Sequence, residues 1–398
     1  MISVDQALRI VLEKVEPLGV ETVALEDAFR RILAEEIRAD IDLPPFDRAR
    51  MDGYAVRSAD VATAPVTLRL LGEIAAGAVF EGAIGAGEAV KIFTGAPLPQ
   101  GADAVQKVEV AESDGQTVTL HEAVKPGQFV IPKASEVRAG EVVAEPGREI
   151  GPAEMAVLAS FGYAEVRVGV RPRVAVLSTG SELVGVADKP TAAQIRNSNS
   201  YTLAAYARRA GATVEILGIV KDTPADTREA LLRAAQTNDV VITSGGVSMG
   251  DYDLVKAALN EIGAEIFFDK VIIRPGKPTV FARRDGVYFF GLPGNPVSTS
   301  VTFNVFARPA IRKMQGESSP LLPTVRAELT SAIKDSSTRR SYLPARLYGS
   351  EGRMMVESLK WGGSSDLVAF MNADALIIVR EDIHEIAMGE MVEALRLI

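Results

Sequence analysis

Residues 240–251 are VVITSGGVSMGD, residues 270–278 are KVIIRPGKP, and residues 287–296 are VYFFGLPGNP. Each stretch begins with an apolar run that is typical of a buried strand and ends in a loop rich in Gly or Pro. Working outward, strand-like and helix-like runs alternate from about residue 172 to residue 314. This alternation predicts a doubly wound α/β domain whose ligand binds at the carboxyl ends of the strands.

The three loops indicate what kind of ligand that is. Glycines at the end of a strand let backbone N–H groups converge on an anion, and a helix that begins there adds its positive end. Two cations, Arg274 and Lys277, stand in the second loop. Together these features predict a pocket for a phosphorylated or oxyanionic ligand.

Acidic residues follow several of the predicted strands, namely Glu182, Asp222, Asp251 and Asp253. Carboxylates gathered at one sheet edge, opposite cations, would suit a Mg²⁺–phosphate site, with Glu182, Asp222 and Asp253 as the metal-binding candidates. Each residue also has a simpler explanation. Asp251 or Asp253 could cap the next helix, Asp222 could be an ordinary turn residue, and Lys277 could be the solvated tip of a hairpin.

Composition narrows the chemistry. The 398 residues include no Cys and only two His, which excludes disulfides and cysteine nucleophiles and makes a His-ligated zinc site unexpected. A net charge of -9 argues against general nucleic-acid binding. Charged residues interrupt the N-terminal segment, and Gly and Pro break the longest uncharged run, so we expect no signal peptide, no membrane association and a cytoplasmic location.

Outside the α/β domain, the sequence pattern predicts a few helices and many short strands. Ser3 and Gln6 form a capping box ahead of a first helix, and a second short helix is expected at residues 25–33. Short strand-like runs separated by turns predict a β-rich domain at residues 45–140 and a C-terminal β-barrel domain at 319–398. The α/β domain takes residues 171–318, and a discontinuous helical and extended linker domain takes 1–44 and 141–170. In the β-rich domain, Asp52-Gly53 lies in a dense charged loop, although an Asp-Gly pair is by default a tight turn.

Six short motifs together resemble one family. They are MDGYA at 51–55, TGAP at 94–97, STG at 178–180, SGGVS at 244–248, PGKP at 275–278 and LPGNP at 292–296. In this order and combination the chain resembles the molybdopterin molybdenumtransferase family, which comprises MoeA and the gephyrin E domain. The likeness extends over nearly the whole chain, although SGGVS alone is shared with the related adenylyltransferases.

The resemblance implies an activity and a set of site residues. It implies a four-domain homodimer that inserts molybdate into adenylylated molybdopterin, with Mg²⁺-dependent cleavage of the pyrophosphate bond and release of AMP. In such a dimer the α/β domain of one subunit and the Asp52 loop of the other would share the site. By resemblance, the functional positions are Asp52, Thr94, Glu182, Asp222, Asp253, Lys277 and Ser364. The residues lining the nucleotide and pterin pocket are then Gly245, Gly246, Ser248, Pro293, Gly294 and Asn295, with Arg274 and Lys277 neutralising oxyanion charge.

The sequence departs from the family pattern at three places. Near Tyr342, Pro344 stands at a position that is commonly basic. Ser181 replaces an Asp that commonly follows Ser-Thr-Gly, and the segment 131–136 is IPKASE where an Arg-rich loop is common. These changes leave open a second hypothesis, a catalytically weakened dimeric interaction scaffold. A third is a molybdopterin adenylyltransferase-like enzyme, against which the Asp52 and Thr94 loops argue. Expected partners are small anionic substrates, a second copy of the chain and the upstream adenylyltransferase.

Overall fold

The computed structural model describes residues 1–247 and 254–397. Its contacts divide the chain into two units, each with its own core. The larger unit contains Met1–Glu35, Pro146–Pro152 and Glu165–Ile398, and the smaller unit contains Glu36–Glu145 and Ala153–Ala164. The finer division into four domains stays a prediction.

A six-stranded mixed sheet forms the centre of the α/β part of the larger unit. Its strands, in spatial order, are β16 (Thr213–Val220), β13 (Arg173–Thr179), β17 (Val240–Ser244), β21 (Val287–Leu292), β20 (Val280–Arg284) and β18 (Glu265–Phe268). The first four run parallel, and β20 is antiparallel to both of its neighbours. Parallel strands β13, β17 and β21 therefore bring their carboxyl ends, and the loops that follow, to one edge of the sheet.

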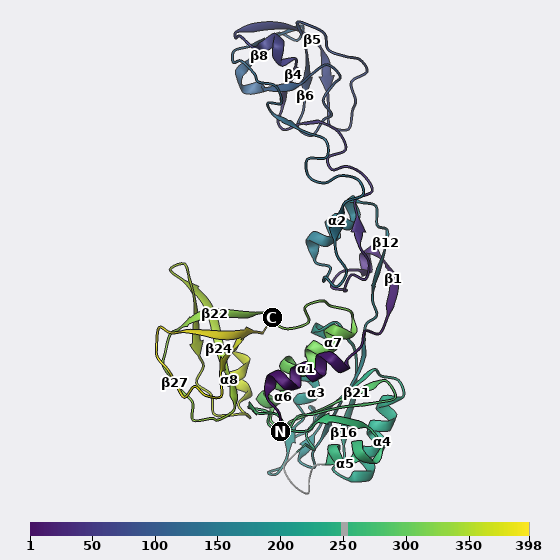
Figure 1. Ribbon diagram of the computed structural model, residues 1–398, viewed down its shortest axis with the longest axis vertical. Helices are drawn as coiled ribbons and strands as arrows, with labels where there is room; N and C mark the ends of the chain where they lie inside the picture. Colours follow the sequence, from purple (N-terminus) through teal and green to yellow (C-terminus); the bar gives the residue numbers. More distant parts are fainter. Residues whose placement is uncertain (248–253, 398) are drawn as a thin grey trace. The chain divides into compact units, whose positions relative to one another are not determined.

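Helices cover both faces of this sheet because its central strands are apolar on both sides. Alternate residues of one strand serve two cores: Val174 and Val176 face one, and Ala175 and Leu177 face the other. The helices are α1 (Val4–Lys14), α3 (Asn199–Arg209), α4 (Pro224–Ala235), α5 (Leu254–Glu261), α6 (Pro296–Thr302) and α7 (Arg308–Met314), with a π-helical turn at Phe303–Ala307 between the last two. In Figure 1, α1, α3 and α6 lie on one side of the sheet and α4 and α5 on the other.

The C-terminal part of the larger unit is a closed five-stranded barrel. Its strands are β24 (Arg340–Ser350), β25 (Arg353–Ser358), β22 (Thr324–Leu329), β28 (Met391–Arg396) and β26 (Ala375–Val379). Strand β24 pairs with both β25 and β26, which closes the sheet on itself. Helix α8 (Leu367–Met371) and the short strands β23 (Ile333–Lys334) and β27 (Glu385–Ile386) complete this part. The predicted α/β fold and C-terminal barrel are both confirmed.

The smaller unit is built on a second six-stranded sheet. Its strands, in spatial order, are β7 (Ala104–Lys107), β4 (Gly53–Val56), β6 (Glu88–Ile92), β5 (Val66–Ile74), β9 (Thr117–Leu120) and β8 (Ala111–Ser113). Two small ladders, β3 (Arg48–Ala49) with β10 (Val130–Ile131) and β2 (Ile37–Arg38) with β11 (Val142–Ala144), and helix α2 (Pro152–Ser160) lie outside it. The tight-turn explanation of Asp52-Gly53 is wrong. Gly53 opens β4, where a Cβ would come within 2.0 Å of the Gln106 carbonyl oxygen on β7.

The prediction of a helix at residues 25–33 is also wrong. Only a single 3₁₀ turn forms, at Leu25–Asp27. Further on, Ile32 and Leu33 make isolated β-bridges to Glu149 and Val168, because this segment continues beside the ladder of β1 (Val20–Ala24) and β12 (Glu165–Gly169). Within residues 1–247 and 254–397, no helix combines the length and the apolar character needed to span a bilayer.

Candidate functional site

A cleft of about 1290 Å³ opens at the carboxyl ends of the parallel strands. Its walls come from loops that follow β13, β16, β17 and β21 and from the segment before α8 in the barrel part. The predicted residues among its lining are Glu182, Asp222, Gly245, Gly246, Arg274, Lys277, Pro293, Gly294, Asn295 and Ser364. The tertiary structure thus gathers ten positions spread over 183 residues of sequence, counting Glu182 to Ser364 inclusively. Ser248 and Asp253 lie outside the described residues.

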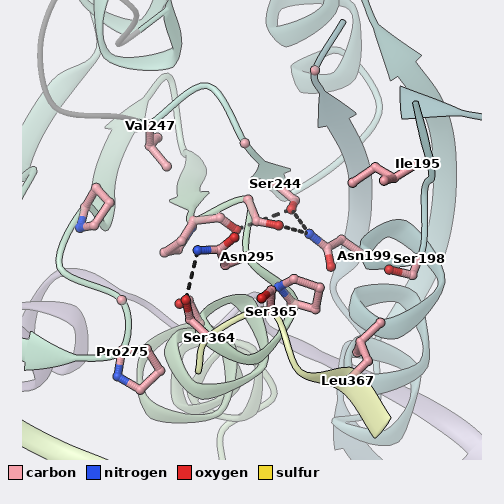
Figure 2. A pocket seen from close by; sticks show the side chains of 18 of the residues that line it. Ile195, Ser198, Asn199, Ser244, Val247, Pro275, Asn295, Ser364, Ser365 and Leu367 are labelled. Carbon is pink, nitrogen blue, oxygen red and sulfur yellow. Dashed lines mark hydrogen bonds between the residues drawn. The ribbon is translucent and has the colours of Figure 1, made fainter. Parts of the chain in front are cut away.

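Asn199, at the first turn of α3, fixes two of the loops to each other. Its side-chain Nδ2 donates hydrogen bonds of 2.7 Å to Ser244 Oγ and of 2.7 Å to the Gly294 carbonyl oxygen. Figure 2 shows the Asn199 side chain beside Ser244, with a dashed line for the hydrogen bond between them. The Oδ1 atom of Asn199 and the Oγ1 atom of Thr179 are buried and have no hydrogen-bond partner within the described part of the chain. Both residues line the cleft, so polar ligand groups would find unused partners there.

Asn295 connects the α/β part to the barrel part across the cleft. It is the N-cap residue of α6, but its side chain makes no capping bond. Instead Asn295 Nδ2 donates to Ser364 Oγ at 2.9 Å, and the Val297 N–H donates to the Ser364 carbonyl oxygen at 2.9 Å. Figure 2 shows Asn295 and Ser364 pointing toward each other. The hydrogen bonds hold the glycine-rich segment 362–363 beside the start of α6.

The Pro-Gly-Lys-Pro loop is held differently from the prediction. The residues before it were expected to form a strand of the α/β sheet, but β19 (Ile273–Arg274) pairs in parallel with β24 of the barrel. Arg274 forms an ion pair with Asp335, whose side chain is 3% exposed. A buried carboxylate therefore fixes the guanidinium at the cleft wall. Lys277 is half-buried in the same wall, and so is not the exposed tip of a hairpin.

Two glycines at the end of β17 allow the closest backbone approach in the site. Gly245 and Gly246 have φ angles of +90° and +68°. A Cβ on Gly245 would lie 2.4 Å from the Thr179 carbonyl oxygen. The loop after β17 can pass next to the end of β13 only with glycine at this position.

Asp52 and Thr94 belong to the smaller unit and contact each other. Asp52 Oδ1 accepts hydrogen bonds from the Thr94 Oγ1 at 2.6 Å and from the Thr94 backbone N–H at 2.8 Å. These bonds stabilise the ionised carboxylate and lower the pKa of Asp52 below its ordinary value of 3.8. Asp52 is therefore an ionised, exposed group at neutral pH.

The altered loop at 131–136 also lies in the smaller unit. Lys133 pairs with Asp42 at 3.2 Å, and Glu136 pairs with Arg48 at 3.1 Å. The Lys133 N–H donates to Asp47 Oδ1 at 2.7 Å. The charges that replace the Arg-rich pattern are thus paired with the segment 42–48.

Several lining residues were missed by the sequence reasoning, among them Arg196, Asn199, Arg339 and Trp361. Asn199 lies in a run of four polar residues, 197–200, at the start of a helix, and that run was the available signal. Arg339 donates to the Ile273 carbonyl oxygen at 3.2 Å from the barrel part. Only the folded chain places that residue beside the Pro-Gly-Lys-Pro loop.

The residues present fit a Mg²⁺–phosphate ligand in part. Glu182 and Asp222 both line the cleft, and two carboxylates together with substrate phosphates are a common environment for Mg²⁺. Among residues 1–247 and 254–397, no group of three His, Cys, Asp or Glu side chains could hold a metal ion without further ligands. The predicted third carboxylate, Asp253, lies outside that range.

Comparisons with known proteins agree along the whole chain. Residues 2–162 match the MoeA N-terminal region (domain I and II), residues 175–313 match a probable molybdopterin binding domain, and residues 326–397 match the MoeA C-terminal region (domain IV). A molybdopterin molybdenumtransferase of Haemophilus influenzae is 36% identical over 396 residues, with 98% of each chain covered. One from Bacillus subtilis is 35% identical, covering 99% of this chain and 94% of the relative.

Solved structures give the same answer for the fold. A molybdopterin biosynthesis MoeA protein from Pyrococcus horikoshii OT3 superposes with a TM-score of 0.85 at 29% identity and full coverage of both chains. A MoeA structure described as from Pyrococcus horikosii has a TM-score of 0.81 at 31% identity, covering 100% of this chain and 99% of that one. The chain belongs to the molybdopterin molybdenumtransferase (MoeA) family.

Proposed function

We propose that this protein is a molybdopterin molybdenumtransferase that inserts molybdate into adenylylated molybdopterin and releases AMP during molybdenum cofactor synthesis. The observation that carries the proposal is the single cleft lined by ten of the predicted anion-binding and carboxylate residues. The relatives named molybdopterin molybdenumtransferase favour this function over a scaffold or an adenylyltransferase.

In this proposal the cleft acts mainly by positioning charge. Lys277 and Arg274 neutralise the oxyanion charge of molybdate and of the pyrophosphate group. Backbone N–H groups of Gly246 and Gly294 contact phosphate oxygens, whereas the Gly245 N–H donates to the Leu292 carbonyl oxygen and holds the loop in place. Asn295 and Ser364 border the same ligand. The protein has no Cys and forms no covalent intermediate in this scheme, since phosphoryl chemistry depends on position and electrostatics.

Glu182 and Asp222, with the predicted Asp253, would hold Mg²⁺. When bound, the ion would offset the negative charge of the pyrophosphate group and polarise the bond to be cleaved. Glu182 and Asp222 line the same cleft as Arg274 and Lys277, so the carboxylates and the cations could act on one ligand. The homodimer, the roles of Asp52 and Thr94 within it, and the cytoplasmic location are further parts of the proposal, and they rest on the resemblance and the sequence.

An assay of AMP release tests the proposal. Purified protein is mixed with adenylylated molybdopterin and Mg²⁺, with and without molybdate. We expect molybdate-dependent AMP release, which Lys277→Ala lowers by at least about 100-fold because it removes a cation from the developing charge. Lys334→Ala is the matched control, since that lysine lies in the barrel part and its side chain is 80% exposed.

Other outcomes identify the alternatives. Absence of turnover in a protein that still dimerises would support the scaffold, and adenylation of free molybdopterin from ATP would support the adenylyltransferase. Normal turnover in Lys277→Ala would contradict the assigned role of the cleft cation. Normal molybdate-dependent turnover in Asp52→Ala would contradict the role assigned to that carboxylate.

A further inference from the structure

A second cavity in the larger unit has an unusual lining. Its volume is about 260 Å³, and its lining residues are Phe29, Arg30, Arg171, Arg208, Arg209, Gly211 and Ala212. None of them lines the cleft described above. Four of these seven residues are arginines in a chain whose net charge is -9. The four arginine side chains are exposed, and a concentration of one charge in a concave surface creates a local positive potential that attracts anions.

The carboxylates near this cavity pair with few of the arginines. Within the described residues, Arg171 and Arg208 make no ion pair and no side-chain hydrogen bond. The Arg209 guanidinium lies over the Tyr206 ring, 5.3 Å from its centroid. Arg30 meets Glu149 at 3.6 Å, with both side chains more than a third exposed. Partial desolvation, and then the positive charge of Arg31, lower the pKa of Arg171 below its ordinary value, and the weaker influence of Glu21 and Asp27 acts in the opposite direction. Positive charge therefore exceeds negative charge around the cavity.

The local backbone does not cancel this charge. Arg208 and Arg209 end α3, and carbonyl groups at the end of a helix repel anions. Here each of these carbonyls already accepts a hydrogen bond: Arg208 from the Gly211 N–H at 2.9 Å, Arg209 from Arg30 Nη2 at 3.5 Å, and Ala210 from Gln315 Nε2 at 2.8 Å. The guanidinium groups, rather than the carbonyls, are left to interact with a ligand.

We propose that this arginine-lined cavity binds a tetrahedral oxyanion of the phosphate or sulfate class. A guanidinium presents parallel N–H donors that match two oxygens of such an anion, and arginines are preferred at sites of this kind. The small volume suits a free oxyanion or the single phosphate group of a larger molecule. This inference does not depend on the proposed function, because no cleft residue takes part.

Isothermal titration calorimetry of the full chain with sodium sulfate, at an ionic strength held constant with NaCl, tests the proposal. The double variant Arg171→Ala/Arg208→Ala is expected to bind sulfate at least about tenfold more weakly, since each lost donor is a charge-assisted hydrogen bond. Arg233→Ala is the matched control, because that arginine lies on α4 and its side chain is 69% exposed. Because Arg171 and Arg208 are exposed, their replacement is expected to leave the unfolding temperature unchanged.

Two further titrations distinguish a free oxyanion from a nucleotide phosphate, and binding in the cavity from binding in the cleft. Titration with AMP in place of sulfate shows whether the cavity binds a phosphate group on a nucleotide more tightly than the free ion. Whichever of the two binds more tightly, loss of that binding in the double variant supports the cavity as the site. Lys277→Ala removes a cation from the cleft and is expected to leave the cavity's sulfate binding intact. Unchanged sulfate affinity in the double variant, or complete loss of binding in Lys277→Ala alone, would overturn the proposal. The proposal would also be overturned if the protein bound no sulfate but showed salt-sensitive self-association that the double variant abolished. Such a result would assign these arginines to a contact with a second copy.

Discussion

The carboxylate of Asp52 shows how one neighbour sets the charge of a side chain. Both hydrogen bonds to its Oδ1 come from Thr94, one from the hydroxyl and one from the backbone. The two bonds favour the ionised form, so the pKa of Asp52 falls below 3.8 even though the group is exposed. A hydrogen-bonded carboxylate of this kind contributes to stability above pH 3.8, and the contribution is lost as the pH falls through its lowered pKa.

Thr94→Val removes the hydroxyl donor and keeps the backbone donor. The pKa of Asp52 is expected to rise toward 3.8 while staying below it, because the Thr94 N–H bond remains. Carbon-detected NMR titration of the aspartate carboxylates, with Asp52→Asn to assign the signal, measures the change. Thr67→Val is the control, since the Thr67 hydroxyl bonds to Thr119 and not to a carboxylate. An identical titration midpoint in wild type and Thr94→Val would contradict this account.

At the scale of elements, the ends of β13 and β17 meet at a loop that only glycine can form. Gly245 combines a φ of +90° with a Cβ position 2.4 Å from the Thr179 carbonyl oxygen. Gly263, after α5, has a similar φ of +76°, but a Cβ there would have no heavy atom within 4 Å. Comparison of the two positions separates backbone strain from crowding.

Gly263→Ala is expected to lower the free energy of unfolding by about 1 kcal/mol, which is the cost of a left-handed conformation for alanine. Gly245→Ala has the same strain and also forces the strand ends apart, so its expected cost is larger, about 3 kcal/mol. Urea denaturation at constant protein concentration measures both values. Equal costs at the two positions would show that the contact with Thr179 relaxes without penalty.

At the scale of the whole molecule, a buried arginine joins segments that are far apart in the sequence. Arg312 on α7, whose side chain is 2% exposed, pairs with Glu149 and Glu317 at 2.5 Å each. Glu149 lies 163 positions earlier, in the short segment Pro146–Pro152 of the same unit. This ion network holds the returning chain against the last helix of the α/β part.

Arg312→Ala is expected to lower the free energy of unfolding by about 3 to 5 kcal/mol, because it leaves Glu317 without its cation, leaves Glu149 with only the longer contact to Arg30, and removes a buried side chain. Arg228→Ala breaks the exposed pair with Glu261 and is expected to cost less than about 1 kcal/mol. Urea denaturation of the two variants provides the comparison. A cost for Arg312→Ala as small as that for Arg228→Ala would mean that the network adds little to the stability of the larger unit.

Much of the local structure was predictable from the sequence. Thr followed by Pro is a local signal for the start of a helix, and Thr223 caps α4, with its Oγ1 accepting the Asp226 N–H at 3.2 Å and Pro224 at the first helical position. Ser3 caps α1 by accepting the Gln6 N–H at 3.1 Å. These signals are local, since donor and acceptor lie three residues apart. The prediction failed at residues 25–33. The spacing of apolar residues there suits a helix, but Ile32 and Leu33 form β-bridges with the distant residues Glu149 and Val168 instead.

The sequence by itself determined the strand–loop–helix alternation, the glycine loops and the cations beside them, because periodicity and glycine freedom act over a few residues. The tertiary structure alone decided which distant groups meet. It paired Ile273–Arg274 with the barrel strand β24, set Asp335 against Arg274, and brought Ser364 to Asn295. It also gathered Arg30, Arg171 and Arg208 around one cavity. Contacts of this kind depend on how whole elements pack, and no short window of sequence contains both partners.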